Sequence, residues 1–369
     1  MHLIQLMHSN RVPETLSLRM GSMTTPDRPS RQRFLDAAAC RKTDRPPAWM
    51  MRQAGRYLPE YRRIREKFSF FGLCESVDAA VEVSLQPFER FRPDAVILFS
   101  DILVPVRAMG APVEIGDSGP KLGSPVRSAK DVERLHGFDP SRETRFVLDI
   151  LSSLRRSVGD SAALLGFAGA PWTLASYLVE GGGSKNFPAI KAMISRDPHA
   201  LRALLTKLSR MVEEYLEAQI EAGADAVQMF DTWAGELSPA EYREFALPYA
   251  RDAIARIRRR GKPVIYFVNG VSGILDLAAQ TGADVLSIDW RCRLDEVRRR
   301  VPGRPLQGNL DPALLLGTPE SVAARVAEIL AETGGDGHIL NLGHGILPET
   351  PLESVEAFYE AVRAFRRPA

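Results

Sequence analysis

Residues 45–62 read RPPAWMMRQAGRYLPEYR, and this stretch indicates both the fold and the place of its site. Ala48 to Met51 is a short apolar run that we interpret as a buried strand, because the prolines before it cannot continue a ladder. Arg52 and Arg56 follow directly. Guanidinium groups bind carboxylates in a bidentate way, so this strand end is predicted to hold an anion with several carboxylates. The alternative is a solvated arginine-rich loop.

The pattern of an apolar run followed by a helical stretch recurs along the chain after Arg31. The predicted strands are 48–51, 95–99, 163–167, 226–230, 264–268, 285–288, 306–307 and 338–342. The predicted helices are 77–91, 142–157, 198–222, 239–260, 273–280, 294–300, 319–332 and 352–365, with an insertion at 102–130. Eight such units predict an α/β fold, a single (β/α)8 barrel with its active site at the C-terminal ends of the strands.

The alternative architecture is an open, doubly wound sheet. A dinucleotide-binding sheet of that kind carries Gly-x-Gly-x-x-Gly at its first strand–helix turn, and this sequence has no such motif. The 369 residues, of which 45% are hydrophobic, suffice for one large domain or two ordinary ones. The repeated strand–helix pattern favours one.

Charge and cysteine content exclude several classes of partner. The chain has 48 basic and 46 acidic residues, and a net charge of +2 gives no general argument for nucleic acid or a membrane surface. No apolar run reaches transmembrane length. The three cysteines, Cys40, Cys74 and Cys292, are far apart, so neither a disulfide framework nor a zinc site is expected. Free thiols are typical of a reducing cytoplasm.

Residues 1–30 differ from the rest of the chain. They contain two histidines, several methionines and many Ser, Thr and Pro residues, without the apolar core of a signal peptide. We predict a disordered N-terminal extension at 1–30 and a barrel domain at 31–369. The alternatives are a true start at Met20 or Met23, or a targeting arm.

Polar residues follow most of the predicted strands, where a barrel places its site. For Asp231, Asn269 and Asn309 we predict a cap or a turn residue, because Asp and Asn commonly cap the helix that follows. Asp101 is different because it follows the apolar run at 96–99, where an unpaired carboxylate is unfavourable. We expect arginines or ligand N–H groups to pair with it. The alternative is a cap of the next turn.

His344 lies between two glycines after the eighth predicted strand. The glycines indicate that the backbone approaches another group closely there. The alternative is a structural histidine. No metal-ligand spacing of His and Cys occurs in the sequence, so no metal site is predicted.

Two stretches carry a family resemblance. PAWMMRQAGRYLPE at 47–60 resembles the N-terminal signature of the uroporphyrinogen decarboxylases. GFAGAPWTL at 166–174, with Tyr177 and EGGGS at 180–184, is similar to the second signature of that family. The glycines at 181–183 alone would indicate a flexible loop near the mouth, or else a phosphate cradle. The resemblance extends from about Arg31 to the C-terminus.

The resemblance implies a carboxy-lyase that removes the four acetate carboxyl groups of uroporphyrinogen III to give coproporphyrinogen III and CO2. It implies porphyrin and haem biosynthesis, no cofactor, no metal, and a cytoplasmic homodimer. Asp101 and Arg52 are then the catalytic residues, and either is a candidate proton donor. The substrate-binding residues that it implies are Arg52, Gln53, Ala54, Gly55, Arg56, Arg65, Asp101, Tyr177, Thr232 and His344.

Two other functions fit a barrel with this pattern. A methyl-transferring barrel would need a zinc cluster of His and Cys at the strand ends, where only Cys292 lies nearby. A porphyrin-binding barrel without turnover would keep the arginines but would not need Asp101.

Overall fold

The computed structural model describes residues 28–116 and 119–366, so the prediction for most of the segment 1–30 lies outside the described residues. Helix α1 (Ser30–Ala38) begins one residue before the predicted domain boundary. Arg28 already pairs with Asp36 at 2.6 Å. The described fold therefore starts slightly earlier than the sequence predicts.

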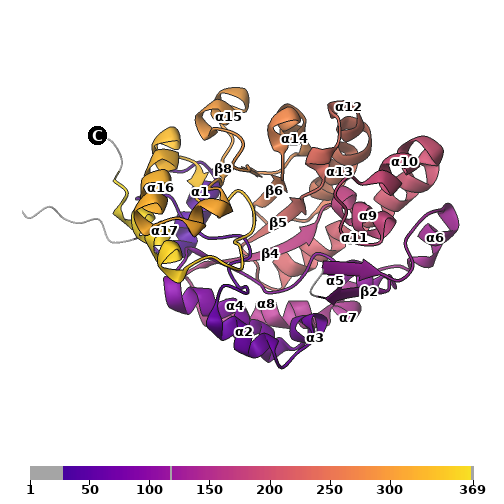
Figure 1. Ribbon diagram of the computed structural model, residues 1–369, viewed down its shortest axis with the longest axis horizontal. Helices are drawn as coiled ribbons and strands as arrows, with labels where there is room; N and C mark the ends of the chain where they lie inside the picture. The colour runs from indigo at the N-terminus through magenta and orange to yellow at the C-terminus, as the bar shows by residue number, and fades with distance from the viewer. Residues whose placement is uncertain (1–27, 117–118, 367–369) are drawn as a thin grey trace, which may run out of the picture.

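A parallel sheet forms the centre of the molecule. Its seven strands follow one another in the order β1 (Ala95–Ile97), β4 (Ala163–Gly169), β5 (Ala226–Asp231), β6 (Val264–Val268), β7 (Val285–Ser287), β8 (Leu306–Gln307) and β9 (His338–Ile339). Such strands are buried on both faces, which is why they read as unbroken apolar runs. In Figure 1 the helices surround these strands as a ring.

Ala48 takes the eighth position and closes the barrel. It pairs in parallel with Leu340, just beyond β9. Leu340 N–H donates to Pro47 O at 2.8 Å, and Asp94 N–H donates to Ala48 O at 2.8 Å, which joins this segment to the start of β1. The predicted strand 48–51 is thus a single bridge, because the chain turns at Met51 and Arg52. The predicted barrel is confirmed.

The outer helices return the chain from one strand to the next. They are α4 (Val77–Phe91), α8 (Arg145–Val158), α11 (Pro198–Glu221), α13 (Leu247–Arg256), α14 (Leu275–Ala278), α15 (Leu294–Arg300), α16 (Pro319–Thr333) and α17 (Leu352–Ala364). The predicted bounds of α4 and α15 are correct. The predicted helix 239–260 is α12 (Pro239–Glu241), a π-helical turn (Tyr242–Ala246) and then α13.

Shorter helices and a hairpin lie in the segments that connect the strands to the outer helices. The insertion after β1 contains α5 (Val104–Ala108), the antiparallel hairpin β2 (Val113–Gly116) and β3 (Gly119–Leu122), α6 (Ala129–Arg134) and α7 (Pro140–Glu143). The sequence patterns did not predict α2 (Pro59–Arg65), α3 (Phe70–Glu75), α9 (Pro171–Glu180) or α10 (Pro188–Arg196). Short 3₁₀ turns lie at Ala234–Glu236, Val271–Gly273, Ala279–Thr281 and Pro312–Leu316.

A polar layer lies inside the barrel. The Gln307 side chain accepts a hydrogen bond from Trp49 Nε1 at 3.0 Å and donates to Gln228 Oε1 at 3.0 Å and to Ser287 Oγ at 2.9 Å. All four side chains are buried, and hydrogen bonding offsets the loss of hydration. These contacts tie the first segment to strands on the other side of the barrel.

Three aspartates at the N-terminal end of the barrel each link two neighbouring strands. Asp225, just before β5, donates its N–H to Leu164 O in β4 at 2.7 Å, and its Oδ2 accepts from Leu164 N–H at 3.0 Å. Asp94 makes the same pair of bonds with Ala48, and Asp284 makes it with Val264. We call these residues the strand-linking aspartates.

Cations pair with each strand-linking aspartate, as the two buried carboxylates, Asp94 and Asp225, require. Asp94 pairs with Arg33 and Arg45, Asp225 with Arg31, Arg155 and Lys262, and Asp284 with Arg259. Many of the arginines of this chain are therefore structural and lie at the end of the barrel opposite the predicted site.

Within residues 28–116 and 119–366, no helix is long and apolar enough to cross a membrane.

Candidate active site

Arg52 occupies a constrained place at the C-terminal end of the barrel. Its backbone is left-handed, with φ of 60°, a conformation that costs free energy for a residue with a side chain and is often found at functional sites. The preceding turn is fixed because Asn341 Oδ1 accepts from Met51 N–H at 2.9 Å and Ile346 N–H donates to Met51 O at 3.0 Å. The side chains of Arg52 and Arg56 are exposed. Neither guanidinium has a hydrogen bond or ion pair with another described residue.

The two glycines beside His344 allow close approaches, as the sequence predicts. A Cβ on Gly343 would lie 2.5 Å from the backbone nitrogen of Trp290. A Cβ on Gly345 would lie 2.8 Å from Cγ and 3.0 Å from Nε of Arg52. A Cβ at position 343 would thus collide with backbone, whereas a Cβ at position 345 would displace the Arg52 side chain, which fills the space that Gly345 leaves.

Gln53 stabilises the loop that carries Arg52 and Arg56. Its side chain is buried and donates to Ala95 O at 3.2 Å, while its backbone oxygen accepts from Tyr57 OH at 2.8 Å. Ala54 and Gly55 are half-buried beside it. Gln53 thus anchors the loop to β1, and its polar groups already have partners inside the protein.

Asp101 follows β1 and is half-buried. Its Oδ1 accepts from Leu103 N–H at 2.8 Å, so the alternative of a cap applies to one of its two oxygens. Its Oδ2 has no hydrogen-bond partner in the part of the chain that the structure describes. Burial raises the pKa of Asp101, and the Leu103 N–H bond and the charge of Arg52 oppose that shift. One oxygen is therefore positioned by the backbone and the other is available to a ligand.

Aromatic rings enclose the region around Asp101. Phe99, two residues before it, is buried, and its ring lies 5.7 Å from Tyr61 and 5.9 Å from Phe70. Arg65 lies on this side of the mouth, where it is half-buried and donates to Phe68 O. Its charge lowers the pKa of the buried Cys74 thiol, and the charge of Asp101 raises the same pKa. A carboxylate in such apolar surroundings interacts strongly with nearby charge.

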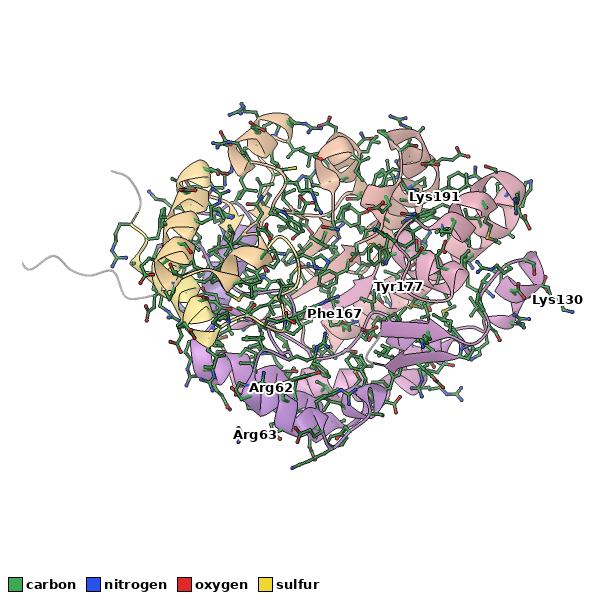
Figure 2. All side chains as sticks on the ribbon, viewed as in Figure 1. Arg62, Arg63, Lys130, Phe167, Tyr177 and Lys191 are labelled. Atoms are coloured by element: carbon green, nitrogen blue, oxygen red, sulfur yellow. The ribbon has the colours of Figure 1, made fainter. Side chains whose placement is uncertain are left out.

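Tyr177 comes from α9, after β4. It is half-buried, and burial and the negative charge of Asp101 raise the pKa of its phenol. In Figure 2, Tyr177 and Phe167 lie inside the ring of helices, whereas Arg63 and Lys130 lie at its outer edge. The Tyr177 ring packs 6.0 Å from Trp233. Thr232, beside Trp233, is half-buried, and its hydroxyl has no hydrogen-bond partner among the described residues.

The prediction of a cap or a turn residue is confirmed for Asn269, which lies in a turn, and is wrong for Asp231 and Asn309. Asp231 is buried and accepts from Thr173 Oγ1 at 2.8 Å and from Tyr266 OH at 2.6 Å. Burial raises the pKa of Asp231 to about 6, although these two hydroxyls oppose the shift. Asn309 donates to the backbone oxygens of Asp289 and Cys292, and Asn269 accepts from Arg291. These side chains bind neighbouring loops because each finds a partner that is distant in sequence.

His344 closes the other side of the mouth. Its ring lies 6.0 Å from that of Phe267 and continues a row of rings formed by Phe167, Phe230 and Phe267 on β4, β5 and β6. Burial, and then the charges of Arg52 and Arg291, lower the pKa of His344 to about 4. His344 is therefore a neutral imidazole at pH 7.

Electrostatic coupling shows which predicted residues the fold brings together. The charge of Arg52 acts on Asp101, Tyr177 and His344, and the charge of Asp101 acts on Tyr177. These four residues come from segments that follow four different strands at the same end of the barrel. Trp233, which packs on Tyr177, and Arg291, which acts on His344, are not among the residues predicted from the sequence. Both lie three residues after the end of a predicted strand, and that position is the available signal.

The glycine-rich loop is anchored rather than free, in contrast to the flexible loop predicted from its composition. Gly181 ends α9 with φ of 85°, and its backbone oxygen accepts from Leu122 N–H at 3.0 Å. Gly182 pairs with Lys121 of β3. A Cβ on Gly182 would lie 2.6 Å from Pro120 O, so glycine is needed for this contact. The loop thereby extends the β2–β3 hairpin beside the mouth.

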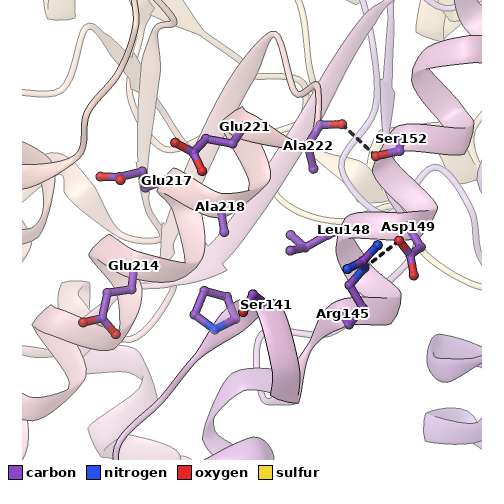
Figure 3. A pocket seen from close by; sticks show the side chains of 11 residues that line it. Ser141, Arg145, Leu148, Asp149, Ser152, Glu214, Glu217, Ala218, Glu221 and Ala222 are labelled. Carbon is purple, nitrogen blue, oxygen red and sulfur yellow. Dashed lines mark hydrogen bonds and ion pairs between the residues drawn. The ribbon is translucent and has the colours of Figure 1, made fainter.

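Two further features of the structure bear on where a site can lie. Among the described residues, no group of three or more His, Cys, Asp or Glu side chains is arranged to hold a metal ion. A groove of about 410 Å³ lies on the outside of the barrel between α7 and α8 on one side and α11 on the other. Figure 3 shows Asp149, Glu214, Glu217 and Glu221 lining it. None of the predicted site residues lines this groove.

Comparisons with known proteins agree with this geometry. A family model described as "Uroporphyrinogen decarboxylase (URO-D)" matches residues 29–365. Curated proteins named uroporphyrinogen decarboxylase are similar along nearly their whole length. The protein from Gloeobacter violaceus is 48% identical over 335 residues, which cover 90% of this chain and 96% of the relative. The protein from Nostoc punctiforme is 46% identical over 347 residues, which cover 93% and 97%.

Solved structures support the fold. A methyltransferase from Methanosarcina mazei has a TM-score of 0.75 at 23% identity, and the match covers 91% of this chain and 98% of that one. A putative vitamin-B12-independent methionine synthase from Listeria monocytogenes has a TM-score of 0.53 at 14% identity, with 86% and 94% covered. At such identities the likeness concerns the fold alone.

Proposed function

The chain belongs to the uroporphyrinogen decarboxylase family, and from this we propose that the mouth of its barrel removes the acetate carboxyl groups of uroporphyrinogen III. The observation that carries the proposal is the family match over residues 29–365. The chain is thus a uroporphyrinogen decarboxylase of porphyrin biosynthesis. The residue roles below are our proposals.

The arginines bind the carboxylates of the substrate. Arg52 and Arg56 present guanidinium groups at the mouth that are free of ion pairs with other described residues, and Arg65 stands on the Asp101 side. Guanidinium–carboxylate pairs are charge-assisted and often bidentate. Tyr177, Thr232 and the neutral His344 add hydrogen-bonding groups around the same opening. Gln53, Ala54 and Gly55 shape the loop that carries the two arginines.

Asp101 binds the pyrrole N–H groups and stabilises positive charge in the ring. Its Oδ1 is held by Leu103 N–H, so the position of the carboxylate is set before substrate arrives. Its Oδ2 accepts from the ligand. A preorganised charge in apolar surroundings, as the rings of Phe99, Tyr61 and Phe70 provide, is an effective form of electrostatic catalysis.

The reaction uses the substrate ring as its own electron sink. A proton adds to the pyrrole carbon beside an acetate arm, and the ring becomes a cation. The bond from the acetate methylene to its carboxylate then breaks, CO2 leaves, and the electron pair flows into the ring. A proton delivered to the former methylene carbon makes the methyl group, and loss of the first proton from the ring carbon restores the pyrrole. Each cycle therefore consumes one proton and one carboxylate. Asp101 and Arg52 are the two candidate donors of the first proton.

Anaerobic incubation of the purified protein with uroporphyrinogen III tests the proposal. We expect CO2 release and successive products with seven, six, five and four carboxyl groups. Binding without CO2 release would instead indicate a porphyrin-binding barrel. We further propose a cytoplasmic homodimer, supported by the family resemblance. Sedimentation equilibrium checks the dimer, and a monomer at micromolar concentration would contradict it.

A further inference from the structure

We propose that Arg291 is a further substrate-binding residue, which holds a propionate carboxylate of the substrate on the side of the mouth opposite Asp101. The proposal rests on the function proposed above and extends it to a residue outside the two sequence signatures. Arg291 lies in the loop between β7 and α15, two residues after Asp289.

The barrel topology places Arg291 across the mouth from Asp101, which follows β1, and three strand positions from the Ala48 segment that carries the other binding arginines. Going round the barrel from β1 through β4, β5 and β6, β7 is four strand positions away, and the route through Ala48, β9 and β8 is equally long. Arg52, Arg56 and Arg65 all follow the Ala48 segment, which neighbours β1. A macrocycle with carboxylates around its whole rim needs a cation on the far side as well.

Neighbouring groups hold the Arg291 guanidinium in place. It stacks over Trp290, with Cζ 4.1 Å from the ring centroid. Its Nη1 donates to Asn269 Oδ1 at 3.0 Å and to Asp289 Oδ2 at 3.1 Å. The side chain is still 46% exposed, and Nε and Nη2 make no hydrogen bond with any described residue. One nitrogen fixes the group, and two others are available for the bidentate contact that carboxylates favour.

The charge of Arg291 reaches the site. Arg52 and Arg291 both act on His344, so the charges of both arginines reach the same imidazole. A ligand bound beside His344 is therefore under the influence of both charges.

A purely structural role for Arg291, as a partner of Asp289, is the alternative. Asp289 is buried, but its carboxylate also accepts from the backbone N–H groups of Gly270, Val271 and Arg291 itself. These bonds persist when the Arg291 side chain is changed. The loop therefore does not depend on the guanidinium, and a substitution there is expected to leave the fold intact.

A propionate is the expected partner because of the order of events. The acetates must reach Asp101 to lose their carboxyl groups, whereas the propionates remain in every intermediate and in the product. A cation far from the reacting centre can hold the same kind of group throughout all four decarboxylations. Arg291 should therefore bind substrate and product alike.

The test is the Arg291→Gln variant, assayed anaerobically beside Arg293→Gln. Arg293 lies two residues further on, is 60% exposed and pairs with Asp295, so the control removes the same charge outside the mouth. We expect KM for uroporphyrinogen III to rise about tenfold or more in Arg291→Gln, the effect of losing one charge-assisted contact. We expect kcat within about twofold of wild type, partial recovery in Arg291→Lys, and no change in Arg293→Gln.

Two measurements separate this inference from a structural role. Equilibrium binding of coproporphyrinogen III should weaken by the same factor as KM rises, and unchanged product binding would assign the contact to an acetate and overturn the proposal. Without any substrate, the NMR-measured pKa of His344 should rise above about 4 in Arg291→Gln, because a nearby positive charge is lost. If wild type is active and Arg291→Gln has an unchanged KM, the inference about Arg291 is overturned and the proposed function stands. An inactive wild type would overturn the proposed function instead.

Discussion

Gly345 packs against the side chain of Arg52, and the space next to its Cα is the space that the arginine fills. A Cβ at position 345 would come within 2.8 Å of Arg52 Cγ. The glycine after the site histidine thus determines where the first site arginine can point. The sequence indicated a close approach at this glycine, and the structure identifies its partner.

We therefore expect Gly345→Ala to impair substrate binding through Arg52. The clash involves the middle of a flexible side chain and no backbone atom, so the protein should fold with a melting temperature near that of wild type. Displacement of Arg52 should raise KM about tenfold or more. Gly273→Ala is the control, because a Cβ there meets nothing within 4 Å. Equal KM values for the two variants would show that Arg52 does not depend on Gly345.

Removal of either arginine at the mouth should weaken binding more severely. Arg52→Ala and Arg56→Ala delete charge-assisted contacts worth on the order of 2–5 kcal/mol when truncated. Arg→Lys should restore only part of the affinity, because an ammonium cannot form the bidentate contact. Arg63→Ala, at the outer edge in Figure 2, is the matched control. Steady-state kinetics check this, and unchanged KM and kcat in both alanine variants would exclude the assignment.

Asp101→Asn should fold and lose turnover. The asparagine oxygen can still accept from Leu103 N–H, and the buried negative charge is removed. Loss of a preorganised electrostatic group reduces kcat by roughly 10²-fold or more. Asp101→Glu should also be impaired, because the added methylene displaces the carboxylate.

Asp139→Asn serves as the control for Asp101, since Asp139 Oδ1 accepts from the N–H two residues on at 2.9 Å in the same way, but Asp139 is exposed and caps the N-terminus of α7. Product analysis and a melting curve on each variant are the measurements. Near-normal turnover in Asp101→Asn would leave Asp101 as a cap only.

Asp225→Asn should destabilise the barrel. The Asp225 side chain is 1% exposed and pairs with Arg31, Arg155 and Lys262. Loss of such a buried pair costs about 2–4 kcal/mol in the free energy of unfolding. Asp160→Asn removes a 73% exposed partner of the same Arg31 and should change it by less than about 0.5 kcal/mol. Urea denaturation at pH 7 distinguishes the two.

The Asp225 contribution should also depend on pH in a defined direction. Burial disfavours ionisation, but the Leu164 N–H, Arg31 and Arg155 outweigh it and hold the pKa of Asp225 below its ordinary value. A depressed pKa contributes stability above the unfolded value of about 3.9, and that stability is lost as the pH falls through the folded pKa. Wild type should therefore lose its advantage over Asp225→Asn below about pH 4. A constant difference down to pH 2 would contradict the assignment.

The sequence predicts the barrel well because its strands are apolar on both faces. Residues 264–268 were predicted with the bounds that β6 has, and the helix patterns of α4 and α15 are equally clear. The short helix α9 was missed because eight of its ten residues are buried, which removes the polar face that marks a surface helix. The predicted first strand is a single bridge in the structure, because Asn341, far along the chain, binds the turn that follows it.

Site residues were predictable only where a charged residue directly follows an apolar strand. Asp101 and Arg52 meet that condition. The sequence favours a cap or a turn residue at Asp231, because its partners Thr173 and Tyr266 lie on other elements and give no local signal. Arg291 and Trp233 were missed for the same reason, since their importance depends on rings and charges that only the closed barrel brings near.

The strand-linking aspartates have a consequence for how the barrel is assembled. They join the Ala48 segment to β1, β4 to β5, and β6 to β7. Among the described residues, no aspartate makes the same pair of hydrogen bonds between β1 and β4, between β5 and β6, or between β7 and β8. Three pairs of neighbouring strands are thus held by side-chain as well as main-chain bonds. Circular permutants opened between strands that lack such an aspartate should fold more readily than permutants that separate a linked pair.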